Sequence, residues 1–592
     1  MTVFLILAVC SEPTGYSHDD GGFKVVTPMP RNTVADVLEC FDDEFAQVAS
    51  AFARGDYLLW LGSGISRDVV PNVKGLLERM LEFLQERIEP ADPACRFKAA
   101  LAEVLEIAGG TATTVDVSTK VSSWPNLNDI VGSLVNQYAD VLDVRVLGEA
   151  DDYLVWTGLD VPTTYGAPDL EPDVEHLCIA ILMLEGVVRS APTTNWDGLV
   201  EAAMERLAGA GHRVLKVVVT PADFAAPDCQ AELVKFHGCA VRAADDPAKY
   251  RSLLIARRTQ IAGWTTKPEN QLMKNRLEYL FASRPAFFVG LSAQDANIQT
   301  VLHQAIQNLA RSWPTEPPAV VFAEQSFHLH HRHVMKATYG NTYAANSLAI
   351  ASSALLGAYA KQALLALVLF TLADKWNALI GHVAELDLPD ADVAQIRDDV
   401  RGIRDAAGES ADRDYRNFIE ALISVLTLAL WVFRQGGIPD PAPYPAISSA
   451  PIAEAAENPD FPRAALGRFA LAFTLIGRGF LNRKWTLELG SLATPGDGVV
   501  RVRNGPRTSK IFVVRDARVL SDLELAGIVD MDDSEVVIAQ AEAVRKPTTR
   551  SPRSRYGRIG KSGARQMDLE TIYASVSTGD ELFEVFVLAG AL

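Results

Sequence analysis

The 592-residue chain is poor in cysteine, with only six in all. No two of them form a Cys-x-x-Cys pair, which excludes a zinc knuckle, a thioredoxin-type motif and a disulfide-stapled scaffold. This usage is typical of the reducing cytoplasm, where we expect the protein to act. The six are Cys10, Cys40, Cys95, Cys178, Cys229 and Cys239.

Positive charge is also scarce. Lys and Arg number 55 against 74 Asp and Glu, so the formal net charge is −19. That balance disfavours a protein that coats nucleic acid or anionic membrane. The exception is the basic segment 544–566, which contains no acidic residue. It is interpreted either as a solvated loop or as a docking element for nucleic acid or an acidic partner.

Uninterrupted apolar runs of membrane-spanning length are missing too. The stretch 348–372 is long enough but contains Lys361 and Gln362, and 423–433 is too short. We therefore expect buried or self-associating helices and no membrane partner. Residues 1–10 are apolar without a basic flank, so a secretory signal is not expected.

Short apolar runs alternate with helical patterns in the first half of the chain. The clearest runs are 57–61, 214–219, 286–290 and 319–322, and we expect 214–219 to be a buried strand. This alternation is typical of a parallel α/β sheet. The expected fold class is therefore α/β, with a Rossmann-like parallel sheet.

The second half has a different pattern. Long helical patterns cover 344–380 and 415–435, the proline-rich stretch 439–451 indicates a boundary, and 582–588 looks like a strand. We expect four parts: an N-terminal extension (1–32), the α/β domain (33–335), a helical region (336–440) and a smaller α+β domain (441–592) for regulation or partner binding.

A glycine turn follows the first predicted strand. In Gly62-Ser63-Gly64 the glycines let the backbone approach a pyrophosphate, and the next helix offers its N-terminal N–H groups. Ser66 and Arg67 add a hydroxyl and a guanidinium suited to phosphate or ribose. A purely structural turn and a surface salt bridge are the alternatives.

Three further polar groups follow predicted strands. Thr194-Asn195-Trp196-Asp197 opens a helix, where ligands bind in open α/β sheets, although Asn195 or Asp197 also suits a helix cap. His237 precedes a glycine and closes an apolar run. In Gly290-Leu291-Ser292 the serine either binds ribose or phosphate or caps the next helix.

Four histidines gather in 327–333. A strand there would place His331 and His333 on one face, as a zinc or nickel site requires. No carboxylate or cysteine run accompanies them, so we expect a polar, partly exposed connector and no metal site.

Taken in order, GSGIS, TTNWD, HG and VGLSAQD resemble the sirtuin family, whose pattern is GAGxS, TQNxD, HG and GTS. The resemblance covers about residues 40–325. The context of 231–238, with Trp264 downstream, looks most like the bacterial sirtuin-like effector branch.

The resemblance implies a site for NAD. Asn195 matches the asparagine that holds a water and ribose hydroxyls, and His237 matches the general base. Arg67 lies near the arginine of the nicotinamide loop, although Asp68-Val69-Val70 departs from the family pattern. The residues implied to contact NAD are Gly62, Ser63, Gly64, Ser66, Arg67, Thr194, Asp197, Gly290 and Ser292.

One family element is missing. Protein-deacylating sirtuins carry a four-cysteine zinc module after the HG motif, whereas Cys239 is the only cysteine beyond it here. No zinc is therefore expected, and water is favoured over acyl-lysine as the acceptor. Zinc-free bacterial relatives are similar to antiphage effectors that hydrolyse NAD to nicotinamide and ADP-ribose, so that NAD depletion causes cell death or dormancy.

Several partners and two other functions stay open. Related effectors work with a HerA-type ATPase, an Argonaute, a nucleotide signal or a phage structural protein, and we expect a homo-oligomer. The alternatives to hydrolysis are a protein deacylase or ADP-ribosyltransferase, and a non-catalytic NAD or ADP-ribose sensor that scaffolds a complex. The pair Asn195 and His237 weighs against the sensor.

Overall fold

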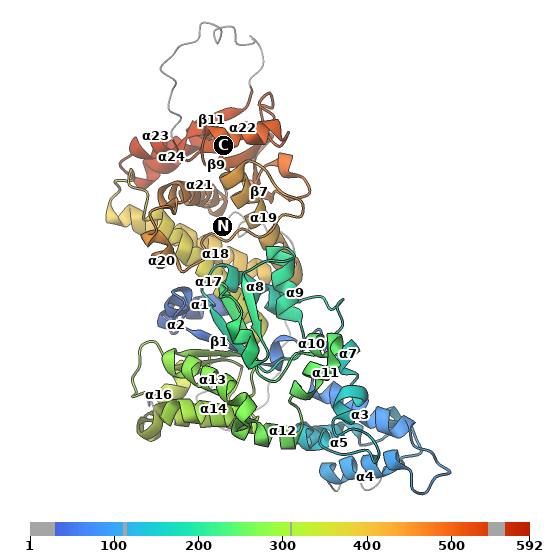
Figure 1. Cartoon of the computed structure of the whole chain (residues 1–592). Coiled ribbons are helices and arrows are strands. Elements are labelled where there is room, and N and C mark those ends of the chain that lie inside the picture. The colour runs from blue at the N-terminus through green and yellow to red at the C-terminus, as the bar shows by residue number, and fades with distance from the viewer. Residues whose placement is uncertain (1–29, 110–114, 308–310, 543–562) are drawn as a thin grey trace.

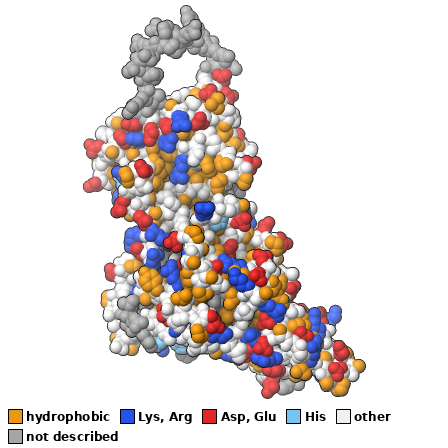
Figure 2. Space-filling view, in the orientation of Figure 1, with side chains coloured by type: hydrophobic (Ala, Val, Ile, Leu, Met, Phe, Trp, Pro, Cys, Tyr) orange, Lys and Arg blue, Asp and Glu red, His pale blue; other side chains and the backbone are white. Residues whose placement is uncertain are grey.

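The computed structural model describes residues 30–109, 115–307, 311–542 and 563–592 (Figure 1). Most of the predicted N-terminal extension and most of the basic segment lie outside these residues. The described chain forms an elongated molecule, with the C-terminal sheet at one end and a small helical projection at the other (Figures 1 and 2).

A six-stranded sheet occupies the middle of the molecule. Its strand order is β3-β4-β2-β1-β5-β6, and every pairing in it is parallel. This confirms the predicted Rossmann-like sheet. The strands are β1 (Leu58–Leu61), β2 (Ser190–Thr193), β3 (Leu215–Val218), β4 (Ala231–Lys235), β5 (Ala286–Val289) and β6 (Val320–Ala323).

Helices cover both faces of this sheet because successive strand residues point to opposite sides. In β1, Leu59 and Leu61 join one core, and Leu58 and Trp60 join the other. The first core includes α1 (Val34–Asp42), α2 (Ala46–Ala53), α8 (Val174–Leu184), α9 (Leu199–Ala208) and α17 (Ala360–Ile380). The second includes α13 (Gln271–Ser283), α14 (Ala296–Gln307), α15 (Leu329–Tyr339) and α16 (Tyr343–Ala354).

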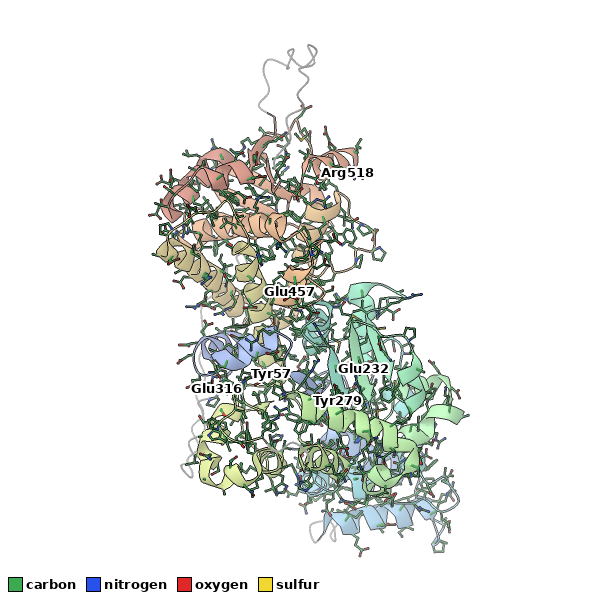
Figure 3. All side chains as sticks on the ribbon, turned by 60° about the vertical axis from the view of Figure 1, so that its left-hand side comes forward. Tyr57, Glu232, Tyr279, Glu316, Glu457 and Arg518 are labelled. Carbon is green, nitrogen blue, oxygen red and sulfur yellow. The ribbon has the colours of Figure 1, made fainter. Side chains whose placement is uncertain are left out.

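Figure 3 labels one residue of the sheet and one of a covering helix, Glu232 on β4 and Tyr279 on α13. The two elements are joined by an ion pair of 2.6 Å between Arg276 and Glu232. Further short helices follow β4: α10 (Ala240–Asp245), α11 (Pro247–Tyr250) and α12 (Arg258–Gly263).

A side lobe is inserted between β1 and β2 and packs around a separate hydrophobic core, which residues of α9, α10 and 254–256 also join. It is the projection at the lower right of Figure 2. Its helices are α3 (Val73–Glu86), α4 (Arg96–Ala108), α5 (Leu127–Val135), α6 (Tyr138–Val141) and α7 (Val161–Thr164), with a π-helical turn at Leu154–Gly158.

The described C-terminal part adds seven α-helices after α17 and a mixed five-stranded sheet of order β11-β10-β9-β8-β7. One continuous core runs from the parallel sheet through α17 into this second sheet. The helices between the sheets are α18 (Asp390–Ala411), α19 (Tyr415–Gln435), α20 (Ile452–Glu457) and α21 (Arg463–Leu481). The rest are β7 (Thr486–Leu489), β8 (Val500–Asn504), β9 (Arg507–Val514), α22 (Ala517–Leu525), β10 (Val536–Gln540), β11 (Arg565–Asp568), α23 (Leu569–Ala574) and α24 (Gly579–Gly590).

Three helices of the described chain are long and apolar enough to cross a membrane: α17, α19 and α21. The apolar windows of these helices are 78%, 61% and 83% buried within the protein, so packing explains their composition. The predicted helix over 344–380 is interrupted between α16 and α17, which places Lys361 in the first turn of α17.

Several sequence expectations are wrong in detail. The run 582–588 lies in helix α24, because Thr578 caps that helix by accepting from the Glu581 N–H. The segment 327–333, expected to be a polar, partly exposed connector, instead enters helix α15 at Leu329, and His331 is buried. The strand over 214–219 is the edge strand β3 and only alternate residues of it are buried.

Candidate active site

Two glycine turns meet where β1 and β5 end side by side. The Gly64 N–H donates to the Gly290 carbonyl at 3.0 Å, and Gly290 adopts a φ of +62°. A Cβ on Gly62 would lie 2.4 Å from the Gly290 oxygen, so this approach needs glycine. Gly62 therefore has a packing role beneath the cavity that its neighbours line.

A cavity of about 700 Å³ opens over these turns, between the sheet and the side lobe. Its size is that of ordinary small-molecule sites. Tyr138 of α6 closes one side by donating its hydroxyl to Asp295 at 2.5 Å. Ten predicted site residues line the cavity: Ser63, Gly64, Ser66, Arg67, Thr194, Asn195, Asp197, His237, Gly290 and Ser292.

Asn195 is buried at the wall of this cavity, just beyond β2. Its backbone N–H donates to Thr193 Oγ1 at 3.0 Å, and its Nδ2 donates to Ser66 Oγ at 3.2 Å. The other amide atom, Oδ1, is buried and has no hydrogen-bond partner among the described residues. A buried acceptor without a partner costs free energy, so this oxygen is poised for a ligand or a water.

His176, which was not predicted from the sequence as a site residue, holds the Ser66 side chain in place. The Asp173 N–H donates to His176 Nδ1 at 3.1 Å, and this assigns the imidazole proton to Nε2. Nε2 lies 3.1 Å from Ser66 Oγ and donates to it. Burial lowers the pKa of His176, which keeps the ring neutral. Ser66 accepts from both His176 and Asn195 and can direct its own proton into the cavity.

His237 has a partner that was also not predicted. Its Nε2 accepts from Asn297 Nδ2 at 2.8 Å, and Asn297 Oδ1 accepts from the Ile298 N–H, which orients the amide. Burial lowers the pKa of His237, so the ring is neutral, with its proton on Nδ1. To take a proton at Nε2, His237 must exchange the Asn297 hydrogen bond for one to substrate or water.

The remaining predicted residues have identifiable structural contacts. Asp197 Oδ1 accepts from the Leu199 N–H at 3.2 Å, which is the capping role considered as its alternative. Arg67 is exposed, and its guanidinium lies 4.8 Å from the centre of the Tyr359 ring. Both still line the cavity, so a cap or a stacking contact does not remove them from it.

A smaller cavity of about 160 Å³ adjoins the first and shares its glycine turns. Glu324, just after β6, lines it together with Tyr359 at the start of α17. Burial raises the pKa of Glu324 to about 7, against the lowering effect of Arg67. The helical region thus contributes to the walls of the site.

The predicted histidine cluster supports the second turn. His331 Nε2 lies 2.8 Å from the Leu291 carbonyl and donates to it, because Nδ1 accepts from the His328 N–H. Burial lowers the pKa of His331 to about 4. No group of three potential metal ligands occurs in the described part of the chain.

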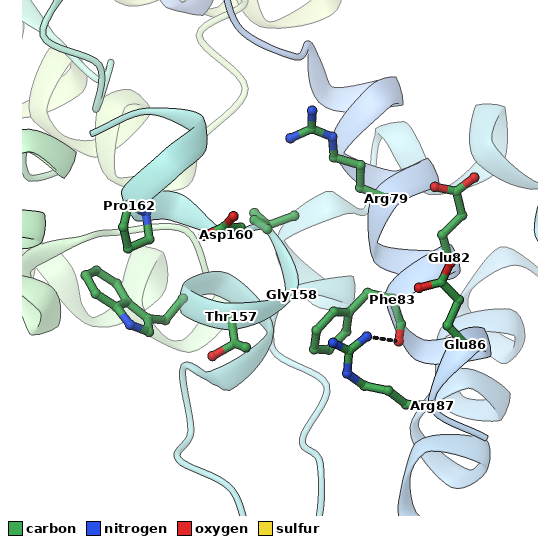
Figure 4. Close-up of a pocket in the computed structure, with 11 residues that line it drawn as sticks. Arg79, Glu82, Phe83, Glu86, Arg87, Thr157, Gly158, Asp160 and Pro162 are labelled. Atoms are coloured by element: carbon green, nitrogen blue, oxygen red, sulfur yellow. Dashed lines mark hydrogen bonds between the residues drawn. The ribbon is translucent and has the colours of Figure 1, made fainter. Parts of the chain in front are cut away.

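A separate hollow of about 480 Å³ lies on the side lobe, between α3 and the π-helical turn (Figure 4). Arg87 is held there against Phe83, donating to its carbonyl at 3.1 Å and lying 3.7 Å from its ring centre. Arg79 donates to Thr164 at 3.0 Å. None of the predicted NAD residues lines this hollow.

Comparison with known families agrees with the fold. A SIR2-like domain matches residues 189–344, which include Asn195, His237 and Gly290-Leu291-Ser292. No curated protein matches the chain. The protein therefore contains a SIR2-like domain on an all-parallel Rossmann-like sheet, and this domain implies an NAD-related activity.

Proposed function

We propose that the protein is an NAD hydrolase that cleaves the bond between nicotinamide and ribose and releases nicotinamide and ADP-ribose. The observation that carries the proposal is Asn195 Oδ1, a buried acceptor that has no partner in the described part of the chain, in the cavity that His237 also lines. Ser66 holds the other end of the Asn195 amide at 3.2 Å, so the free oxygen has a defined direction.

The cavity suits NAD in size and chemistry. The turns around Gly64 and Gly290 bring backbone close to the cavity wall, as pyrophosphate binding requires. Arg67 supplies a positive charge for the phosphates. Asn195 and the neutral imidazole of His237 are suited to a water and to ribose hydroxyls.

Catalysis of this reaction depends more on positioning water and substrate than on a strong acid or base. When the C1′–N bond breaks, its electron pair leaves with nicotinamide, and C1′ acquires oxocarbenium character. Water held by Asn195 adds to C1′ and loses one proton, so the products are nicotinamide, ADP-ribose and H⁺. His237 accepts that proton after releasing Asn297. Holding water and C1′ together supplies much of the rate enhancement.

Deacylation and ADP-ribosyl transfer are the competing reactions. They need a site for a peptide or another acceptor, which the deacylating relatives support with their four-cysteine module. In this chain Cys239 is the only cysteine after His237, and it lies buried at the start of α10. We therefore favour water as the acceptor.

The cellular role is proposed from the resemblance alone. We place the enzyme in the cytoplasm as a homo-oligomeric effector of antiphage defence, which depletes NAD and causes abortive infection. We predict that its activity is controlled by a HerA-type ATPase or another defence-system partner, by nucleic acid or by a nucleotide signal.

The test is NAD turnover by the purified protein, read as nicotinamide and ADP-ribose. Asn195→Ala and His237→Ala should each abolish turnover without loss of the fold. Asn377→Ala is the matched control, because its Oδ1 is also buried without a described partner but lies on α17 outside the cavity. Wild-type turnover in folded Asn195→Ala and His237→Ala would overturn the assignment.

A further inference from the structure

Lys361 joins two segments of the candidate site. It lies in the first turn of α17, outside the SIR2-like match, and is mostly buried. Its ammonium donates to Asp68 Oδ2 at 2.8 Å and to Asp173 Oδ2 at 3.0 Å. Asp68 follows the first glycine turn and Asp173 precedes α8, so one side chain of the helical region holds both.

Each of these two residues is linked to Ser66. Asp68 stands two residues after it in the chain. Asp173 reaches it through His176, because the Asp173 N–H donates to Nδ1 and Nε2–H donates to Ser66 Oγ. Ser66 then accepts from the Asn195 amide. A displacement of Asp173 is therefore transmitted to Asn195 through the hydrogen bonds of His176 and Ser66, and a displacement of Asp68 through two residues of the chain.

The charges around Lys361 explain how its ammonium holds the two segments together. Glu175 lies 3.7 Å from the same ammonium and is buried, so three carboxylates converge on one cation. Removing the ammonium takes this counter-charge from Asp68 and Asp173, with Arg416 3.6 Å from Asp173 as the remaining cation there, and repulsion between the two carboxylates then favours separation of the two segments.

The helical region has further contacts at the same place. Arg416 of α19 donates to the Pro172 carbonyl at 2.6 Å, next to Asp173. Tyr359 lies beneath the guanidinium of Arg67. The two helices therefore bear directly on the segments that carry Ser66 and His176.

We propose that Lys361 is a positioning residue through which the helical region holds Ser66 and Asn195 in the geometry for NAD cleavage. The inference rests on the proposed hydrolase function. Lys361 touches no reacting atom and acts through Asp68, Asp173 and His176.

The first test compares turnover by Lys361→Met, Lys361→Arg and Arg397→Met. The last removes an exposed charge from α18 and serves as the control. We expect Lys361→Met to lower kcat by about 100-fold with little change in KM, because misplacement of a catalytic group by about 1 Å costs that much. Lys361→Arg retains the charge and should restore most of the activity.

A double-mutant cycle separates positioning from general destabilisation. If Lys361 acts through His176, the kcat of Lys361→Met/His176→Leu should fall no further than that of the worse single variant. Additive losses, or wild-type kcat in Lys361→Met, would overturn the proposal.

A crystal structure of Lys361→Met gives a readout that does not depend on turnover. We expect the hydrogen bond between Asn195 Nδ2 and Ser66 Oγ to be broken, and an unchanged bond would contradict the inference. Absence of turnover in the wild-type protein would instead count against the hydrolase function. Should Lys361→Met not fold, Lys361→Gln serves in both experiments.

Discussion

A buried ion pair connects the SIR2-like sheet to the C-terminal half, and its removal should be costly. Lys375 of α17 and Glu185, after α8, have side chains only 1% and 0% exposed and lie 2.7 Å apart. The ammonium also contacts the Glu185 carbonyl and both oxygens of Ser448. The other carboxylate oxygen, Oε1, accepts from the Tyr444 hydroxyl and the Ile447 N–H. The pair therefore joins three segments that are distant in the sequence.

Lys375→Met should lower the free energy of unfolding by about 3 kcal/mol, since removing one partner of a buried pair leaves an uncompensated charge. This loss lies at the lower end of the range for broken buried ion pairs, because the Glu185 carboxylate keeps its hydrogen bonds from Tyr444 and Ile447. Urea unfolding followed by tryptophan fluorescence measures the change. In Lys375→Met/Glu185→Gln the loss should be smaller than the sum of the single losses, by about 1–3 kcal/mol.

The control breaks an exposed pair. Arg54 and Asp56 have side chains 55% and 44% exposed, so Arg54→Met should cost less than about 1 kcal/mol. A Lys375→Met loss no larger than that of Arg54→Met would refute the reasoning, as would strict additivity in the double variant.

Two further predictions concern the site and its surroundings. Gly290→Ala should destabilise the protein by about 1–2 kcal/mol and weaken NAD binding, because its φ is +62° and the Cβ would lie 2.8 Å from Gly64 Cα. Burial raises the pKa of Glu175 to about 7, so its stabilising contribution is present below its unfolded pKa of 4.5 and is lost as pH rises to about 7. Between pH 4.5 and pH 8, the free energy of unfolding of Glu175→Gln should therefore rise by about 3 kcal/mol relative to that of the wild-type protein.

A specific experimental result would contradict each of these two predictions. Gly132→Ala in helix α5 is the control for the first, because a Cβ there meets nothing within 4 Å and should stabilise the helix slightly. Equal effects at Gly290 and Gly132 would refute the steric argument. For the second, a stability difference between Glu175→Gln and wild type that does not vary with pH would show that the Lys361 ammonium fully offsets both the burial of Glu175 and its repulsion by Asp173 and Asp68.

Local signals predicted the parallel sheet well. The runs ending at Leu61 and Val289 are continuous apolar segments followed by glycine turns, and both are central strands. The bounds of α19, Tyr415–Gln435, were also readable, because apolar periodicity is a local property.

The failures have physical causes. The run 582–588 is apolar and β-branched, but the cap at Thr578 and the acidic first turn of α24 favour a helix. Helix α18 lies in the predicted helical region but was not singled out, because it is highly charged, and only its contacts with α17 and α21 show which side is buried.

The partners of the candidate site residues were beyond sequence reasoning. Ser66 lies 110 positions from His176 and 129 from Asn195, and Lys361 lies 188 from Asp173. Motif spacing places residues at the ends of strands, but only the packed structure shows that none of the described residues hydrogen-bonds to Asn195 Oδ1.

The central claim is that NAD lies across the two glycine turns, with its nicotinamide ribose at Asn195. A crystal structure of Asn195→Ala soaked with NAD tests this most directly, since the variant should bind NAD without cleaving it. The account predicts the nicotinamide ribose between residue 195 and His237, and the pyrophosphate over the turns at Gly64 and Gly290. NAD bound elsewhere, or no NAD at saturating concentration, would contradict it.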